Sequence, residues 1–223
     1  MVHDGASFRD CNFAVFNLAG LGQMTPNTVL IHFLEGGFEE EWNLGCTEFV
    51  ESMRDVLKHR LNLLSSRFQV KNSNSRLIID VWPILEPSLP NARETIHLTL
   101  MFAYILSKSS SWKNSTIRVF HYCHDSRSDF DDRLNEVNQL LDDCRISANL
   151  EIIPLPIKSE SFAENANVLI KNHSENADVA FVSVARPFTD AQHYFEHLDY
   201  LTKDCCPIVM VCSNGQDVLT KDL

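Results

Sequence analysis

Two apolar runs near the end of the chain, Val179-Ala-Phe-Val-Ser-Val184 and Ile208-Val-Met-Val-Cys212, decide the fold class. Each run is nearly continuous in apolar and β-branched residues, which is typical of a strand covered on both faces. Residues 191–201, which lie between the runs, repeat their apolar side chains at helical spacing. A strand, a helix and a second strand in this order predict two parallel strands joined by a right-handed crossover.

The same alternation extends upstream through most of the chain. Apolar runs predict further strands at residues 29–33, 77–82, 117–120 and 150–153, and stripes of helical period predict helices at residues 49–61, 96–106, 129–144 and 163–171. Thr47 is the expected N-cap of the first of these helices. We therefore expect an α/β fold, with a mostly parallel sheet and helices on both faces.

The segment 96–106 differs from the other predicted helices because it is apolar nearly all round. A helix of this kind is either buried in the core or forms the seam of a dimer. Because a parallel sheet needs helices over both of its faces, we favour the core.

Composition and charge restrict the function further. The chain has 223 residues, of which 44% are hydrophobic and 22% charged, as in ordinary globular proteins. Its net charge of −11 argues against duplex nucleic acid as a partner, because that binding depends on Lys and Arg. The longest apolar run, residues 98–106, is far shorter than the roughly 20 residues of a membrane span. No secretory leader is recognisable, and the seven cysteines lack regular spacing, so we expect free thiols in the cytosol.

The first residues read differently from the rest of the chain. Residues 8–18 predict one short apolar helix, and the turn Gly20-Leu-Gly22 then leads towards the strand at 29–33. A helix and loop with no strand before them are what the tail of a preceding unit would look like. We therefore expect residues 1–27 to be the remnant of a preceding subdomain and residues 28–223 to form the α/β subdomain.

Two short patterns are typical of cofactor or metal sites, but their context favours a structural role. Gly20-Leu-Gly22 precedes a strand, whereas a dinucleotide fingerprint follows a strand, opens a helix and contains a third glycine. His193-Tyr-Phe-Glu196-His197 matches the inverted zinc-protease pattern H-x-x-E-H on a predicted helix. Zinc would need a third protein ligand, and this helix must also bury its apolar residues, so we expect no zinc site there.

Two further patterns contain cysteine. His121-Tyr-Cys123-His124-Asp125 follows a strand, at the edge where α/β proteins bind ligands, and its residue types suit zinc. Ligands this close in sequence rarely reach one ion without a second pair elsewhere. Cys205-Cys206 precedes a proline and is neither a CxxC pair nor a nucleophile elbow, so we expect two buried small residues.

Because G-x-S-x-G, P-loop and paired-carboxylate patterns are also absent from the sequence, we predict no catalytic, cofactor-binding or metal-binding residues and no enzyme activity.

Five segments, in this order, resemble the C-terminal cytosolic domain of the cation–chloride cotransporters, solute carrier family 12. The resemblance extends over nearly the whole chain. The segments are Gly20-Leu-Gly-Gln-Met-Thr-Pro-Asn-Thr-Val-Leu30, Ile79-Asp-Val-Trp82, Trp112-Lys-Asn-Ser-Thr-Ile-Arg-Val-Phe120, Arg145-Ile-Ser-Ala-Asn-Leu-Glu151 and Tyr194-Phe-Glu-His-Leu-Asp-Tyr-Leu-Thr202.

Details indicate the cotransporter-interacting protein branch of this family. Pro83 follows Trp82 where the transporting members have a second aromatic residue, and Pro26 occupies a position typical of the branch. The ending Val218-Leu-Thr-Lys-Asp-Leu223 is also similar to that branch. There are departures from other members: Cys212-Ser-Asn-Gly215 replaces an R-G-G-G stretch, and the long phosphorylated insertion is missing from the short segment 154–162. Control through that insertion is therefore not expected.

The resemblance implies a fold similar to universal stress proteins and a non-catalytic regulatory and assembly domain on the cytosolic side of a membrane protein. It implies a homodimer, with other cation–chloride cotransporters as further partners, and no cofactor. Chloride-coupled cation transport, or modulation of partner cotransporters, is the role it implies for the full-length protein.

A competing hypothesis is a nucleotide-binding module of the universal stress type. Such modules carry a glycine-rich loop before the last strands, and Gly215 is the only glycine in residues 174–223. A third hypothesis, a metalloprotease acting through His193 and His197, requires stoichiometric zinc.

Overall fold

A computed structural model describes residues 26–33, 39–67, 77–84, 89–123, 127–154, 161–187 and 190–215. The strands in these ranges are β1 (Thr28–His32), β2 (Asn62–Arg67), β3 (Ile78–Trp82), β4 (Thr116–Cys123), β5 (Asn149–Pro154), β6 (Val179–Ser183) and β7 (Ile208–Cys212). The helices are α2 (Glu39–Lys58), α3 (Ala92–Lys108), α4 (Arg127–Asp143), α5 (Phe162–His173) and α6 (Ala191–Thr202), with a short 3-10 helix η1 (Ser110–Trp112).

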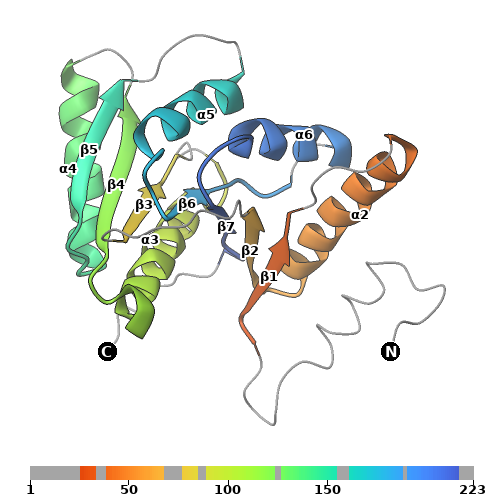
Figure 1. The fold of residues 1–223 in the computed structure, drawn as a ribbon, viewed down its shortest axis with the longest axis horizontal. Coiled ribbons are helices and arrows are strands. Elements are labelled where there is room, and N and C mark those ends of the chain that lie inside the picture. The colour runs from red at the N-terminus through yellow and green to blue at the C-terminus, as the bar shows by residue number, and fades with distance from the viewer. Residues whose placement is uncertain are drawn as a thin grey trace.

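The strands of the described ranges form one sheet in the order β1-β2-β7-β6-β3-β4-β5 (Figure 1). Strands β3 to β7 are parallel to one another. Strand β2 pairs antiparallel with β7, and β1 pairs parallel with β2, so the first two strands run opposite to the other five. The predicted mostly parallel sheet is confirmed.

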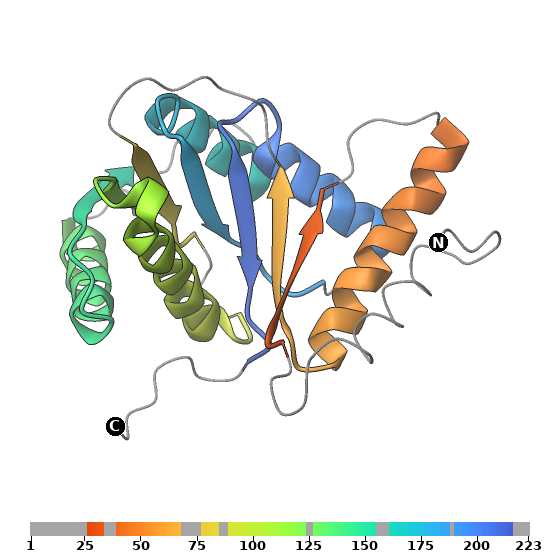
Figure 2. The same ribbon diagram turned by 60° about the horizontal axis from the view of Figure 1, so that its bottom comes forward.

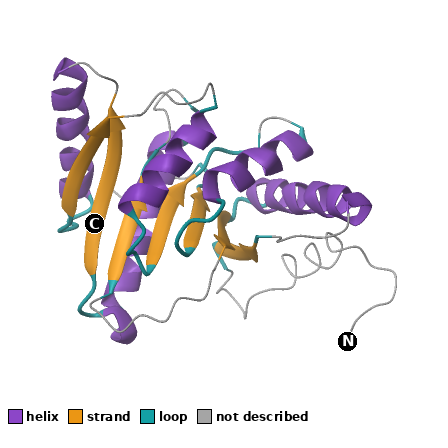
Figure 3. Cartoon of the chain, turned by 45° about the horizontal axis from the view of Figure 1, so that its top comes forward, coloured by secondary structure: helices purple, strands orange, loops and turns teal. Residues whose placement is uncertain are grey.

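Helices cover both faces of this sheet (Figures 2 and 3). Helices α2, α5 and α6 bury their apolar sides in one core cluster, which includes Phe49 and Leu198. Helices α3 and α4 bury theirs in a second cluster, which includes Leu141. Because neighbouring residues of a strand point to opposite faces, Met210 of β7 lies in the first cluster and Val211 in the second. The predicted α/β class, with helices on both faces, is therefore confirmed.

Strand β2 has no apolar run, and the sequence patterns miss it. Its six residues include Asn62, Ser65, Ser66 and Arg67, so polar residues dominate. Ser65 and Ser66 are nevertheless almost completely buried, because β2 lies between β1 and β7 in the sheet. The antiparallel pairing with β7 makes this segment a strand, and that pairing is a long-range contact.

The predicted N-cap of the first helix is wrong. Helix α2 begins at Glu39, and Thr47 lies inside it with an exposed side chain. Residues 39–44 include three glutamates and a leucine, which are good helix formers, and extending an existing helix costs little. The predicted apolar stripe itself is confirmed, since Phe49, Met53 and Val56 are fully buried.

Helix α3 packs on the sheet against β3, β6 and β7, which supports the core interpretation of residues 96–106. The helix is not buried all round, however. Leu100 and Ala103 are buried, whereas Ile105 is 58% exposed. An apolar residue on the outer side of a covering helix stays in contact with solvent because the sheet contacts only one side.

The two tryptophans at strand positions differ in exposure, as the sequence predicts. Trp82 is fully buried at the end of β3. Trp112 ends η1 before β4 and is only half-buried.

Several expectations fall outside the described residues. These are the helix at 8–18 and the Gly20-Leu-Gly22 turn. Strand β1 begins at Thr28, but the proposed boundary between a remnant at 1–27 and a subdomain at 28–223 stays a prediction. No helix within the described ranges has the length and apolar character needed to cross a membrane.

Candidate functional site

The carboxyl ends of β3 and β6 form the switch point of the sheet, where open α/β folds bind ligands. The chain continues from β3 to β4 and β5 on one side, whereas β6 and β7 lie on the other side. The beginning of α3 and the segment after β7 meet at this edge, because the Ser213 N–H donates to Thr95 Oγ1 at 3.1 Å. This edge is the candidate functional site that the fold provides.

Buried hydroxyl groups at this edge bond to one another. Thr99 Oγ1 donates to Thr95 O at 2.7 Å and lies 2.9 Å from Ser183 Oγ, which ends β6. All three residues are buried. The hydroxyls therefore satisfy one another inside the fold, as buried polar groups generally do.

Arg186, Asn91 and Gly215 approach one another at the outer side of the same edge. Arg186 Nε and Nη2 each lie 3.4 Å from Ser213 O, to which they donate. Gly215 has a φ of +88°, and a Cβ there would lie 2.5 Å from Asn91 Oδ1 and 3.1 Å from Arg186 Nη2. Only glycine fits this backbone and this approach. Protein side chains thus occupy the space over the loop after β7.

The His121–Asp125 pattern is only partly within the described residues. His121 lies on β4, is 5% exposed, and its ring centroid is 5.4 Å from that of Tyr122. The side chain of Cys123 and residues 124–126 fall outside the described part of the chain. His121 therefore has a place in the packed sheet, and the expectation that these residues do not form a zinc site stays untested.

The pattern His193–His197 lies on α6, as predicted. His193 is exposed in the first turn, where Asp190 caps the helix by accepting the His193 N–H at 2.9 Å. His197 is half-buried, and burial, followed by the nearby His193, lowers its pKa. Glu196 is exposed and accepts a hydrogen bond from Gln192 at 3.0 Å.

In the ranges that the structure describes, no group of three or more His, Cys, Asp or Glu side chains is placed to hold a metal ion. The absence of a zinc site stays a prediction, and elemental analysis of the full chain tests it. One zinc per chain that is lost on His193→Ala would contradict it.

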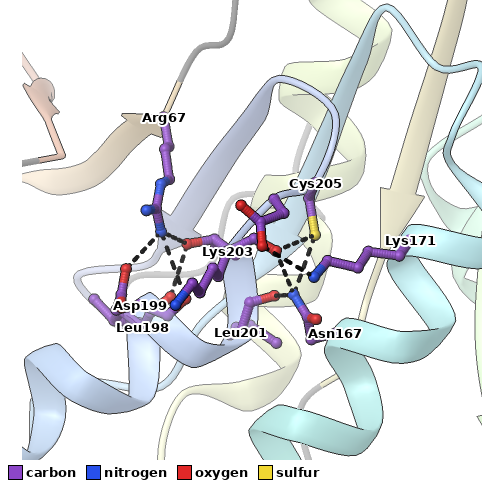
Figure 4. A network of polar contacts seen from close by, with 10 residues as sticks. Arg67, Asn167, Lys171, Leu198, Asp199, Leu201, Lys203 and Cys205 are labelled. Atoms are coloured by element: carbon purple, nitrogen blue, oxygen red, sulfur yellow. Dashed lines mark hydrogen bonds and ion pairs between the residues drawn. The ribbon is translucent and has the colours of Figure 1, made fainter. Parts of the chain in front are cut away.

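Cys205 and Cys206 are both buried, as predicted from their context. Asn167 of α5 organises this region: its Nδ2 donates to Leu201 O and Lys203 O at 3.0 Å each and lies 3.2 Å from Cys205 Sγ (Figure 4). One amide group thus ties α5 to the end of α6 and to the turn that follows it.

A second polar connection joins β2 to α6 and was not found by sequence reasoning. Arg67 Nη1 donates to Asp199 Oδ1 at 2.8 Å and to Thr202 Oγ1 at 3.0 Å (Figure 4). The Arg67 guanidinium also lies over the Phe33 ring, 5.0 Å from its centroid. Asp199 is 132 residues from Arg67, so no local pattern marks the pair.

A partly buried ion pair lies between β3 and β4. Arg118 Nε and Nη2 donate to Asp80 Oδ1 and Oδ2 at 2.7 Å each. Asp80 is completely buried, and this burial raises its pKa, while the bonds from Arg118 and Ser174 partly lower it. An aspartate within an apolar strand run was the available signal for this pair. Its bidentate geometry fixes the register of two parallel strands.

Thiol chemistry is suppressed at four of the buried cysteines in the described ranges. Burial raises the pKa of Cys46, Cys144 and Cys205 to about 11. Burial raises the pKa of Cys212 to about 12. Because the thiolate is the reactive form, these four side chains are poor nucleophiles and poor metal ligands at neutral pH.

Comparison with known proteins connects these features to a family. The model of solute carrier family 12 matches residues 49–165, more than half of the 223 residues. Solute carrier family 12 member 9 of Danio rerio is 24% identical over 272 aligned residues, which cover 88% of this chain and 30% of that protein. The chain thus spans about a third of the length of this relative.

Solved structures agree on the fold. The match to the cytoplasmic domain of a prokaryotic cation chloride cotransporter covers 94% of this chain and 70% of the solved chain. The TM-score is 0.64 and the sequence identity is 14%. The match to a universal-stress-type protein from Pseudomonas aeruginosa UCBPP-PA14 covers 82% of this chain and 62% of the solved chain. The TM-score is 0.52 and the sequence identity is 13%. A fold similar to universal stress proteins is therefore confirmed. The chain belongs to solute carrier family 12, and it has the fold of a cation–chloride cotransporter cytoplasmic domain.

Proposed function

We propose that this chain is a non-catalytic regulatory and assembly domain on the cytosolic side of a cotransporter-like membrane protein. The observation that carries the proposal is the match to solute carrier family 12 over residues 49–165, on a fold shared with a cotransporter cytoplasmic domain. The arrangement of Arg186, Asn91 and Gly215 at the switch point supports a role for outer surfaces rather than for a cleft.

The proposed partners are a second copy of this chain and other cation–chloride cotransporters. Closed two-fold dimers are the commonest protein oligomers, so a C2 dimer is the expected assembly. Residues 8–18 contribute apolar side chains in the sequence that would add to such an interface or to a preceding subdomain.

Sedimentation equilibrium over a concentration series tests the assembly role. The full chain should dimerise reversibly, and a variant lacking residues 1–21 should be more soluble and stay folded. A strict monomer at high concentration, with and without residues 1–21, would contradict the assembly role and leave the family assignment intact.

The role of the full-length protein is a separate proposal: chloride-coupled cation transport or modulation of partner cotransporters. Chloride-dependent rubidium uptake in cells that express a partner cotransporter separates the two. If the full-length protein is a modulator, it should change the uptake by the partner and produce none by itself. Uptake in cells without any partner would instead support transport.

The alternative, a nucleotide-binding module, rests on the likeness to a universal-stress-type fold. Against it, Gly215 has Asn91 and Arg186 close above it, and the glycine-rich loop is absent from the sequence. Calorimetric titration of the chain with Mg-ATP should show no saturable heat. Stoichiometric ATP binding would replace the assembly proposal by this alternative.

A further inference from the structure

A cavity of about 210 Å³ lies at the opposite edge of the sheet from the switch point. It is formed where α3 ends, where β4 begins and where the turn between α4 and β5 passes. These are the amino ends of the strands, so the cavity is separate from the ligand position of the fold class. Its polar lining consists of Lys108, Lys113 and Arg145 with Ser107, Ser115 and Ser147.

The cavity concentrates positive charge on an acidic protein. Lys108, Lys113 and Arg145 line one small volume, whereas the whole chain carries a net charge of −11. None of the ion pairs formed among the described residues uses any of these three cations. Lys108 Nζ lies 4.6 Å from the centroid of the Tyr104 ring, which holds the ammonium group in place while leaving its N–H donors for a ligand.

A hydroxyl group in the wall supports the same conclusion. Ser115 Oγ is buried and has no hydrogen-bond partner among the described residues. Buried hydroxyls are nearly always bonded, so an orphaned one beside a cavity is expected to serve whatever enters that cavity. Ser107 differs, because its hydroxyl already donates to Tyr104 O at 2.7 Å. Ser115 therefore has a hydroxyl proton to offer to a ligand.

Complementing the negative ends of nearby helices would explain some of these three cations, but not all of them. Helices α3 and α4 both end near the cavity, and each helix C-terminus carries roughly −0.5 of a charge, which a nearby cation complements. Lys108 is in the last turn of α3, and Arg145 follows the end of α4. Lys113 lies after η1 and belongs to neither helix. Three full positive charges leave a surplus of about +2 over the two helix ends.

We infer that this cavity binds a phosphoryl group, as inorganic phosphate or as the phosphate of a small monoester. A phosphate dianion balances the surplus charge, and its several acceptor oxygens suit a guanidinium fork, two ammonium groups and a hydroxyl. The volume is below the range of roughly 300–1,000 Å³ that holds drug-sized ligands, so a whole nucleotide is not the expected occupant. Chloride has a single charge and cannot bridge all of these donors. The inference is independent of the proposed assembly role.

Isothermal titration of the full chain at low ionic strength tests the site, with inorganic phosphate and O-phospho-L-serine as probes. Both should bind one to one, competitively, with a dissociation constant in the millimolar range or tighter. Lys113→Gln and Arg145→Gln should each weaken binding by about tenfold, and the double variant by about a hundredfold. Lys203→Gln removes an exposed lysine outside the cavity and should leave binding unchanged.

Ser115→Ala tests the contribution of the Ser115 hydroxyl to phosphate binding while the three cations stay in place. It should weaken phosphate binding several-fold while the unfolding transition stays in place. If phosphate binds and phosphoserine does not, the ligand is inorganic phosphate. If both bind, the site also accepts a phosphate monoester. Either result supports the site. No binding of either probe, unchanged binding in the double variant, or chloride that competes at equal concentration would overturn the inference.

Discussion

At the scale of single residues, Trp82 is the largest fully buried side chain among the residues that the structure describes. Its ring stacks on Phe120 with 4.8 Å between centroids, and Nε1 donates to Ser174 Oγ at 2.9 Å. Trp82→Ala leaves a cavity that a packed sheet cannot fill, so it should lower the free energy of unfolding by about 3–5 kcal/mol. Urea denaturation followed by circular dichroism measures this loss.

Two further variants give stability losses with which the loss in Trp82→Ala can be compared. Trp112→Ala removes a half-buried ring and should cost clearly less than Trp82→Ala. Ser174→Ala leaves the buried indole N–H without its acceptor and should cost about 1–3 kcal/mol. An unfolding midpoint that Trp82→Ala does not change would contradict the central position of β3.

The buried thiols give a second prediction, one that depends on pH. The pKa of Cys46, Cys144 and Cys205 rises from 9.0 to about 11 because burial disfavours the thiolate. A raised pKa means that the folded state holds the proton more tightly than the unfolded state. This contribution to stability is therefore complete below pH 9 and is lost as the pH rises through about 11.

Alkylation with iodoacetamide, followed by peptide mass spectrometry, measures the reactivity of each thiol. At mildly alkaline pH these three cysteines should react only after unfolding in guanidinium. A cysteine among them that is labelled as fast as free cysteine in the native chain would show that its burial is wrong. The free energy of unfolding should also fall between neutral and strongly alkaline pH.

At the scale of elements, Arg67 attaches helix α6 to strand β2, the strand that reverses the direction of the sheet. Its side chain is only 15% exposed and bonds to Asp199 and Thr202. Arg67→Gln removes hydrogen bonds to a charged group and should lower the free energy of unfolding by about 1–3 kcal/mol. Chemical denaturation of the variant, at two salt concentrations, measures the change.

Lys58→Gln is the matched control for this ion pair. Lys58 pairs with Asp55 at 3.3 Å within α2, but its side chain is 65% exposed. An exposed pair contributes little, so the expected change is below about 0.5 kcal/mol. Equal losses in the two variants would mean that Arg67 acts only as a surface charge.

At the scale of the whole molecule, the acidic charge opposes the proposed self-association. Two copies that each carry a net charge of −11 repel one another, and salt screens that repulsion. The dimer should therefore tighten as sodium chloride is added. Sedimentation equilibrium over a salt series measures the trend. A dimer that dissociates with added salt would instead indicate an interface built on opposite charges.

Much of the fold was predictable because its signals are local. The apolar runs of β6 and β7 are buried along their whole length, as their composition predicts. The apolar stripe of α2 is buried in the core, as its helical period predicts. Strand β2 was missed because Ser65 and Ser66 carry no strand signal and are buried only by their neighbours. The N-cap at Thr47 was wrong because helix propagation upstream overrides a single capping residue.

The amino-acid sequence by itself determined the fold class, the order of most elements and the resemblance to solute carrier family 12, since these depend on periodicity and on short segments. Only the tertiary structure decided which distant residues meet. Lys108 and Lys113 flank the short helix η1, whereas Arg145 follows α4, and nothing in either segment marks the three cations as a group. Arg67 and Asp199 are likewise joined by a crossing of sheet and helix. Side chains far apart in the chain converge because packing the two helical layers on one sheet fixes their positions, and no local pattern encodes that geometry.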